Sequence, residues 1–266
     1  MKDGLRQLFA DLHREGTFLM PNAWDIGSAK LLASLGFPAV ATTSAGLGAA
    51  LGRMDQEVSL DELVVHVRDL VAAVKIPINV DAENGYAATP QGVAETVDRL
   101  AAEGAAGLSI EDYDPSSGIY PLDVAIDRVA AAVEAAKRHG VVLTARAENY
   151  LYDIDDIDDT IARLRAFREV GADVLYAPRI EDHKKIARLV AEVDGPLNVL
   201  LMRTTPTVDQ LADIGVRRIS TGGALALTAY GALASAAREL LTSGTSTFAA
   251  AALTNEDRVA AFGADA

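Results

Sequence analysis

The chain has 266 residues, of which 50% are hydrophobic, and a formal net charge of −14 at pH 7. This length suits one large domain with an extensive core, and the negative charge argues against nucleic acid or an anionic membrane as a partner. There is no cysteine, which excludes disulfides, thiolate metal sites and cysteine nucleophiles. No apolar run approaches the ~18 residues of a membrane span. The first residues lack the apolar core of a signal peptide, so we expect a cytoplasmic protein.

Strand and helix patterns alternate along the chain. A predicted helix over residues 5–14 precedes predicted strands over residues 17–21, 39–43, 76–80, 107–110, 141–145, 174–177, 197–201 and 218–221. Periodic apolar residues predict a helix after each strand, over residues 26–35, 60–74, 90–103, 124–138, 157–169, 183–192, 207–213 and 224–241. Ser59 and Glu62 form a capping-box pattern at the start of one of these helices.

A glycine closes several of the predicted helices just before the next strand, as expected of a residue that readily takes the left-handed conformation: Gly36, Gly104, Gly171 and Gly215. Eight strand–helix units with short connections predict a (β/α)8 TIM barrel rather than an open sheet. We therefore predict one catalytic barrel over residues 1–241, including the extra N-terminal helix, and a helical tail over residues 242–266. That tail either packs on a neighbouring subunit or is a frayed end.

Acidic side chains collect at the carboxyl ends of the predicted strands, where function resides in this fold. Asp81 and Glu83 follow the third strand, and an extended backbone would point both to the same side. Glu111 ends the adjacent strand, and Asp55 lies on the loop after the second. Hard oxygen ligands of this kind suit Mg²⁺, or Mn²⁺. The alternative is a group of solvated loop acids.

Three further features of that rim have two readings each. Arg146 can grip a substrate carboxylate with its paired N–H groups, or it forms a structural ion pair with Glu111 or Glu148. The small-residue turn 44–48 can bind an oxyanion with its backbone N–H groups, or it is only a tight turn. The glycines of residues 221–223 can hold a phosphate at a helix N-terminus, or they only allow close packing, which we favour.

Histidine and lysine are missing from the predicted rim. The four histidines fall on predicted helices or at their ends, and we expect them at the surface: His13, His66, His139 and His183. No histidine-based zinc site or catalytic triad is visible. A Schiff-base aldolase needs a lysine at the rim, and the lysines nearest to the predicted strands lie on helices or just after them. An aldolase-like barrel is therefore disfavoured.

Several motifs together resemble the isocitrate lyase/phosphoenolpyruvate mutase superfamily, over residues 12–241. They are Pro-Asn-Ala-Trp-Asp (21–25), Thr-Ser-Ala-Gly (43–46), Val-Asp-Ala-Glu-Asn-Gly-Tyr (80–86), Ile-Glu-Asp (110–112) and Ala-Arg (145–146). The pair of acidic motifs is the most specific part of the match. Members of this superfamily use a Mg²⁺-bound 2-oxo acid, or its enolate, to make or break C–C or C–P bonds.

The resemblance implies a role for each matched residue. Asp81 would be the direct metal ligand, and Glu83 and Glu111 would hold metal-bound waters. Asp55 would be the acid on the loop after strand two, and Arg146 the arginine that grips the substrate. Further substrate-binding residues would be Ser44, Ala45 and Gly46 in the turn, Trp24 in the first motif, and Arg179 after strand six.

The loop after strand four departs from the superfamily. The lyases for isocitrate and methylisocitrate carry a Lys-Lys/Arg-Cys-Gly-His loop there, but residues 112–121 contain no Cys, Lys or His. The Lys/Asn pattern of the mutases and phosphonopyruvate hydrolases is missing too. Glu83 also replaces the Asp common at its position. Arg179 or Arg203 could meet a second substrate carboxylate, or both are ordinary surface arginines.

These departures favour one class of reaction. We expect a metal-dependent enzyme that cleaves a C–C bond of a 2-oxo or 2-hydroxy acid through an enolate, by oxaloacetate-type decarboxylation or by lysis of a substituted malate. The alternatives are C–P chemistry, a metal-binding barrel without the original activity, and a barrel that binds phosphate. The resemblance further implies a homodimer or homotetramer with exchanged C-terminal helices.

Overall fold

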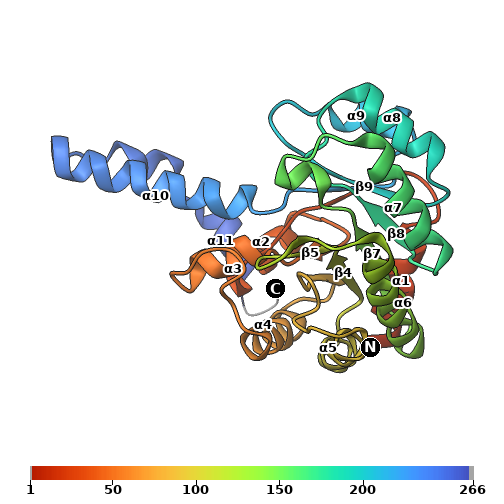
Figure 1. Ribbon diagram of the computed structural model, residues 1–266. Coiled ribbons are helices and arrows are strands. Elements are labelled where there is room, and N and C mark those ends of the chain that lie inside the picture. Colours follow the sequence, from red (N-terminus) through yellow and green to blue (C-terminus); the bar gives the residue numbers. More distant parts are fainter. Residues whose placement is uncertain (1, 264–266) are drawn as a thin grey trace.

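Eight parallel strands form a nearly closed barrel in the computed structural model, which describes residues 2–263 (Figure 1). Around the barrel they run β1 (Phe18–Met20), β10 (Arg218–Ser220), β9 (Leu197–Leu200), β8 (Val174–Tyr176), β7 (Val142–Arg146), β4 (Gly107–Glu111), β3 (Ile78–Asp81) and β2 (Val40–Ala41). A bridge between Asn22 and Ala41 joins the two end strands. The predicted barrel is confirmed.

Helices after the strands cover the outside of the barrel, as expected from their apolar faces. They are α2 (Ile26–Ser34), α4 (Leu60–Ala73), α5 (Pro90–Glu103), α6 (Leu122–His139), α7 (Ile157–Glu169), α8 (His183–Glu192) and α9 (Val208–Asp213). The capping box of Ser59 and Glu62 is present at the start of α4. The four helix-closing glycines all have positive φ, from +89° at Gly36 to +113° at Gly104. The predicted helix ends are therefore confirmed.

The N-terminal helix α1 (Lys2–Leu12) closes the end of the barrel where the strands begin. Its Phe9 is fully buried among Phe18, Val142 and Val174, in a core separate from the larger one between the strands and the outer helices. Gly107 allows this approach, because a Cβ at that position would lie 2.3 Å from the Phe9 ring. His13, just after α1, is also buried, so its predicted surface position is wrong.

Five short elements are not among the predicted ones: α3 (Ser44–Ala50), the strands β5 (Tyr113–Asp114) and β6 (Gly118–Ile119) of one hairpin, and the 3-10 helices η1 (Asn149–Tyr152) and η2 (Thr247–Ala251). The predicted turn at residues 44–48 is instead the first part of α3. Thr43 caps this helix by accepting the N–H of Gly46 with its hydroxyl. Small residues carry no apolar period, so the pattern gave no sign of a helix.

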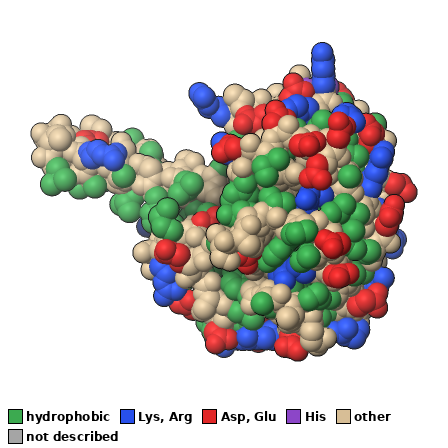
Figure 2. Space-filling model, in the orientation of Figure 1, with side chains coloured by type: hydrophobic (Ala, Val, Ile, Leu, Met, Phe, Trp, Pro, Cys, Tyr) green, Lys and Arg blue, Asp and Glu red, His purple; other side chains and the backbone are tan. Residues whose placement is uncertain are grey.

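The last long helix, α10 (Ala224–Ser243), leaves the barrel as an arm instead of covering it (Figure 1). Ala226 is the buried residue of this helix, and hydrophobic side chains lie along the arm in Figure 2. The chain then turns back, and α11 (Asn255–Phe262) packs against α2. The predicted boundary at residue 241 thus falls inside α10, and residues 264–266 of the predicted tail lie outside the described residues.

None of the helices described between residues 2 and 263 is long and apolar enough to cross a membrane.

Candidate active site

A pocket of ≈ 170 Å³ opens at the carboxyl ends of the strands. Four of the predicted site residues line it together with the first residues of α3: Asp55, Asp81, Glu111 and Arg146. They come from three strands and one loop, which the barrel brings to the same edge. The central part of the predicted site is therefore assembled.

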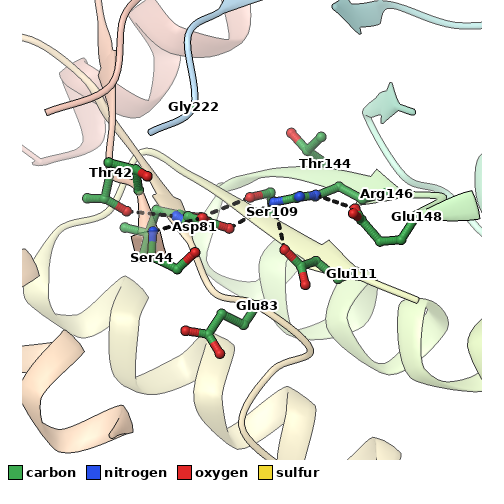
Figure 3. Close-up of polar contacts among 12 residues, drawn as sticks. Thr42, Ser44, Asp81, Glu83, Ser109, Glu111, Thr144, Arg146, Glu148 and Gly222 are labelled. Carbon is green, nitrogen blue, oxygen red and sulfur yellow. Dashed lines mark hydrogen bonds and ion pairs between the residues drawn. The ribbon is translucent and has the colours of Figure 1, made fainter. Parts of the chain in front are cut away.

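Asp81, the last residue of β3, is held from two sides (Figure 3). Its Oδ2 accepts the backbone N–H of Ser44 at 3.1 Å, and its Oδ1 lies 3.0 Å from Nη1 of Arg146. The backbone N–H of Asp81 donates to the hydroxyl of Thr42 at 2.8 Å. The carboxylate is thus fixed in direction before any ligand enters the pocket.

Arg146, which ends β7, contacts three carboxylates. Its Nη1 lies 2.9 Å from Glu111 Oε1, its Nε donates to Glu148 Oε1 at 2.6 Å, and Asp81 is the third partner. The structural ion pairs considered above are therefore present. Burial raises the pKa of Glu148 to about 7 and raises that of Glu111 well above its usual value, although Arg146 acts in the opposite direction. The single positive charge of Arg146 thus contacts three carboxyl groups and cannot neutralise all of them.

Glu83 lies below Asp81 in Figure 3, apart from the contacts between Asp81 and Arg146, and it does not line the pocket. Because β3 ends at Asp81 and Glu83 has φ +45°, the alternation of an extended strand does not reach it. The expectation that both side chains point to the same side is therefore wrong. Glu83 is buried and accepts the hydroxyl of Tyr86 at 2.8 Å. Burial, together with the charges of Asp81 and Asp55, raises the pKa of Glu83 to about 7.

The donor atoms of the pocket fit Mg²⁺ held by one carboxylate and by water. No group of three acidic or histidine side chains forms a ready-made cation site between residues 2 and 263. Mg²⁺ does not need one, because it usually keeps several waters and takes one or two protein carboxylates. Asp55, Asp81 and Glu111 all present hard oxygen atoms to the pocket. Desolvation and the charge of Asp81 raise the pKa of Asp55, so the pocket carries negative charge that a cation would offset.

The start of α3 offers fewer free N–H groups than the predicted turn. The N–H of Ser44 is bound to Asp81 and that of Gly46 to the Thr43 hydroxyl. The N–H of Ala45 makes no hydrogen bond within the described residues, and Ala45 lines the pocket. Trp24 does not line it but packs on α3, where a Cβ at Gly46 would lie 2.9 Å from the Trp24 Cβ.

Two predicted rim features lie elsewhere. Arg179 is exposed and donates to the carbonyl of Leu151 and the carboxylate of Asp153, both at 3.2 Å. It does not line the pocket, and Arg203 is also exposed.

The backbone N–H groups of Thr221 and Gly222 are both bound to Oδ1 of Asn22, at 3.0 and 2.8 Å. A side-chain oxygen of the chain itself thus occupies the predicted phosphate cradle. The reading of residues 221–223 as a phosphate site is therefore disfavoured.

The sequence analysis does not predict several of the pocket residues, among them Gln56, Tyr152 and Arg218. Gln56 donates to the hydroxyl of Tyr152 at 3.0 Å, and the Tyr152 ring stacks on Tyr113 of the β5–β6 hairpin, with ring centroids 3.4 Å apart. These contacts join loops after three different strands, so no spacing in the sequence connects them. Arg218 was predicted as part of a strand, and its inward direction could have been inferred from the alternation of β10.

Comparison with known proteins agrees with the geometry. A family model for phosphoenolpyruvate phosphomutase matches residues 9–241. The 2-methylisocitrate lyase of Salmonella typhimurium is 29% identical over 216 residues, which are 76% of this chain and 72% of that protein. An oxaloacetate decarboxylase of Paraburkholderia xenovorans is 31% identical over 202 residues, 72% of this chain and 67% of the other. The crystal structure of a proposed lyase/mutase from Burkholderia cenocepacia is 45% identical, with a TM-score of 0.93, and covers 96% of this chain and 95% of its own.

Proposed function

Because the chain belongs to the isocitrate lyase/phosphoenolpyruvate mutase superfamily, we propose that it is a Mg²⁺-dependent lyase that cleaves a carbon–carbon bond of a 2-oxo or 2-hydroxy acid. Oxaloacetate-type decarboxylation is the first candidate, and lysis of a substituted malate is the second. Relatives with named activities include lyases and decarboxylases. These relatives support the class of reaction, and the substrate of this chain is our proposal.

The composition of the pocket carries this proposal. Its lining in the described part of the chain combines the carboxylates of Asp55, Asp81 and Glu111 with arginine, and includes neither lysine nor histidine. The chain also has no cysteine. Decarboxylation needs no strong acid at the leaving group, because CO₂ departs without a proton. A pocket of this composition therefore suits decarboxylation better than a reaction whose leaving group must be protonated.

The residues have distinct tasks in this scheme. The bond between C3 and the departing carboxylate breaks, and its electron pair moves into the 2-oxo group as an enolate. Arg146 is already fixed beside Asp81 and stabilises that charge as it develops. A bound Mg²⁺, held by Asp81 and through water by Glu111, would polarise the 2-oxo group as a Lewis acid; Glu83, which does not line the pocket, would not contact it directly.

Binding and proton return complete the reaction. The free N–H of Ala45 and the Ser44 hydroxyl, both at the wall of the pocket, would bind the substrate carboxylate. Asp55 pairs with no arginine or lysine among the described residues. Its raised pKa makes it the candidate to return a proton to C3. Gln56 and Tyr152 close the wall beside it and limit the entry of water.

One assay panel tests the reaction class. Purified protein with Mg²⁺ is incubated with oxaloacetate, phosphonopyruvate and methylisocitrate, and release of CO₂, phosphate and succinate is measured. We expect turnover of oxaloacetate. Phosphate release from phosphonopyruvate without turnover of oxaloacetate would contradict the proposal. Measurable Mg²⁺ affinity without turnover of any of these acids would instead support a barrel that has lost its activity.

We also propose that the arm joins two or more copies of this chain into a homodimer or homotetramer. α10 exposes several large apolar side chains, including Leu233 at 65% and Leu241 at 86%. Several large apolar side chains exposed on one helix are typical of an interface rather than of a helix that stays in solvent. The exchange of C-terminal helices that the resemblance implies would place a second copy of the chain against this surface.

A further inference from the structure

The floor of the pocket holds a buried arginine that the proposed reaction does not use. Arg218 begins β10, is 1% exposed, and lines the same cavity as Asp81. Ser220, two residues further along β10, lines the cavity as well. Arg218 therefore lies deeper in the barrel than Ser220, by roughly 6–7 Å along the strand.

Every side chain that binds Arg218 is neutral. Its Nε donates to Asn198 Oδ1 at 2.8 Å, and its Nη2 donates to Thr144 Oγ1 at 2.9 Å. Its Nη1 lies 3.3 Å from His13 Nε2. The Nδ1 of His13 lies 2.8 Å from the carbonyl oxygen of Phe9, which only accepts, so Nδ1 carries the proton and Nε2 accepts from Arg218. Burial and Arg218 lower the pKa of His13 to about 3, so the imidazole is neutral.

The charge of Arg218 is uncompensated in the protein. No carboxylate of residues 2–263 lies within ion-pair distance of it, whereas Arg146 contacts three and Arg163 contacts two. A guanidinium has five N–H groups, and the three bonds above leave one on each terminal nitrogen. Burial of a cation without a counter-charge is strongly unfavourable. The missing negative charge therefore has to come from a group that enters the pocket.

We propose that Arg218 forms a second anion subsite on the floor of the pocket, which takes one small, singly charged group. Two sources share this chemistry: the distal carboxylate of a dicarboxylate substrate, and a free anion such as chloride. The cavity of ≈ 170 Å³ limits the size of the group. Two free N–H groups of one guanidinium suit a carboxylate, which can accept both.

The two sources have different consequences for the reaction. A carboxylate held by Arg218 keeps its charge, so it is not the group that leaves as CO₂. With the substrate as source, the subsite rests on the proposed function and favours its second candidate. In lysis of a substituted malate, the C2 hydroxyl gives its proton to Asp55, the C2–C3 bond breaks, and C2 becomes the carbonyl. The electron pair moves into the distal carboxylate as its enolate, where Arg218 stabilises the added charge, and Asp55 then returns the proton to C3 to give the second acid. A free anion leaves decarboxylation open.

The subsite is tested by binding, so its outcome is independent of turnover. Wild type is compared with Arg218→Met and with Arg217→Met, a control that removes the same charge from the half-buried residue directly before β10, where the alternation of side chains points it away from the barrel interior. Calorimetry in the presence of Mg²⁺ compares 2-oxoglutarate with 2-oxobutanoate, which differ by one distal carboxylate. If the substrate is the source, we expect 2-oxoglutarate to bind about tenfold tighter or more in wild type and the control, and equally in Arg218→Met.

The second arm tests the free anion. Melting temperatures are measured with sodium chloride against sodium fluoride at constant ionic strength. A chloride-dependent rise of several degrees in wild type and the control, absent in Arg218→Met, supports a free anion. If Arg218→Met shows the same preference for 2-oxoglutarate and the same response to chloride as wild type, the subsite is wrong. If that variant does not fold, bromide in wild-type crystals decides: an anomalous peak within hydrogen-bond distance of the guanidinium supports the subsite. No peak, with equal binding of both acids, overturns it.

Discussion

Substitution of Glu83 by glutamine tests how strongly the acidic cluster opposes folding. Glu83 is 7% exposed, and its pKa is about 7 in the folded protein against the ordinary 4.5. As the pH rises, the Glu83 carboxyl therefore loses its proton at a lower pH in the unfolded chain than in the folded protein. The stability of the folded protein falls between pH 4.5 and about 7 and then levels off. This difference in the pKa of Glu83 lowers the free energy of unfolding by about 3 kcal/mol at alkaline pH. Glutamine has no charge to bury and still accepts the Tyr86 hydroxyl.

The measurement is urea unfolding at several pH values, with a chelator present so that no metal offsets the charge. At pH 8 we expect Glu83→Gln to be more stable than wild type by about 3 kcal/mol, which is roughly 6–12 °C in melting temperature. At pH 4.5 the two proteins should be similar. Glu15→Gln changes an exposed carboxylate and should follow wild type throughout. Parallel stability curves for wild type and Glu83→Gln from pH 4.5 to 8 would refute the reasoning.

Three further substitutions probe other parts of the molecule. Asp81→Ala should abolish Mg²⁺-dependent turnover and weaken Mg²⁺ binding in calorimetry while circular dichroism stays unchanged; full activity would rule out the metal-centred site. Leu233→Asp should shift the protein towards monomer in sedimentation, because it charges the apolar face of the arm, whereas Leu8→Asp at an exposed position of α1 should not; the same sedimentation for both variants would contradict the arm as an interface. Gly107→Ala should destabilise by about 1–3 kcal/mol through overpacking, because its Cβ meets Phe9 at 2.3 Å, while Gly231→Ala on α10 meets nothing within 4 Å and should not destabilise.

The barrel and the centre of its site could be predicted because both depend on local rules. Apolar periods and closing glycines locate helices and strands, and parallel strands bring their carboxyl ends to one edge. That rule alone was enough to bring Asp81, Glu111 and Arg146 together. The partners of Arg146 could not be ranked in advance, because three carboxylates reach it from β3, from β4 and from the segment just after β7. Which acids pair with it depends on side-chain packing that no spacing records.

The errors have a common physical origin in tertiary context. Glu83 departs from its strand because the backbone takes positive φ there, which an acidic residue gives no reason to expect. Arg179 was assigned to the pocket from its position after strand six, but it also has positive φ and points to Asp153 at the surface. His13 looked like a surface residue because a short amphipathic helix is usually exposed on one side. The barrel instead uses that helix as a plug.

The plug has a consequence for the motions of the molecule. His13, next to α1, holds the guanidinium at the pocket floor, and Phe9 seals the barrel beneath it. Detachment of α1 would let water reach Arg218 and relieve its desolvation, so opening of this helix is easier than its apolar burial alone implies. Short terminal helices are already among the first segments to open in native proteins. The rate of hydrogen exchange in α1 would therefore depend on whether an anion compensates the charge of Arg218, although the pocket opens at the opposite end of the barrel.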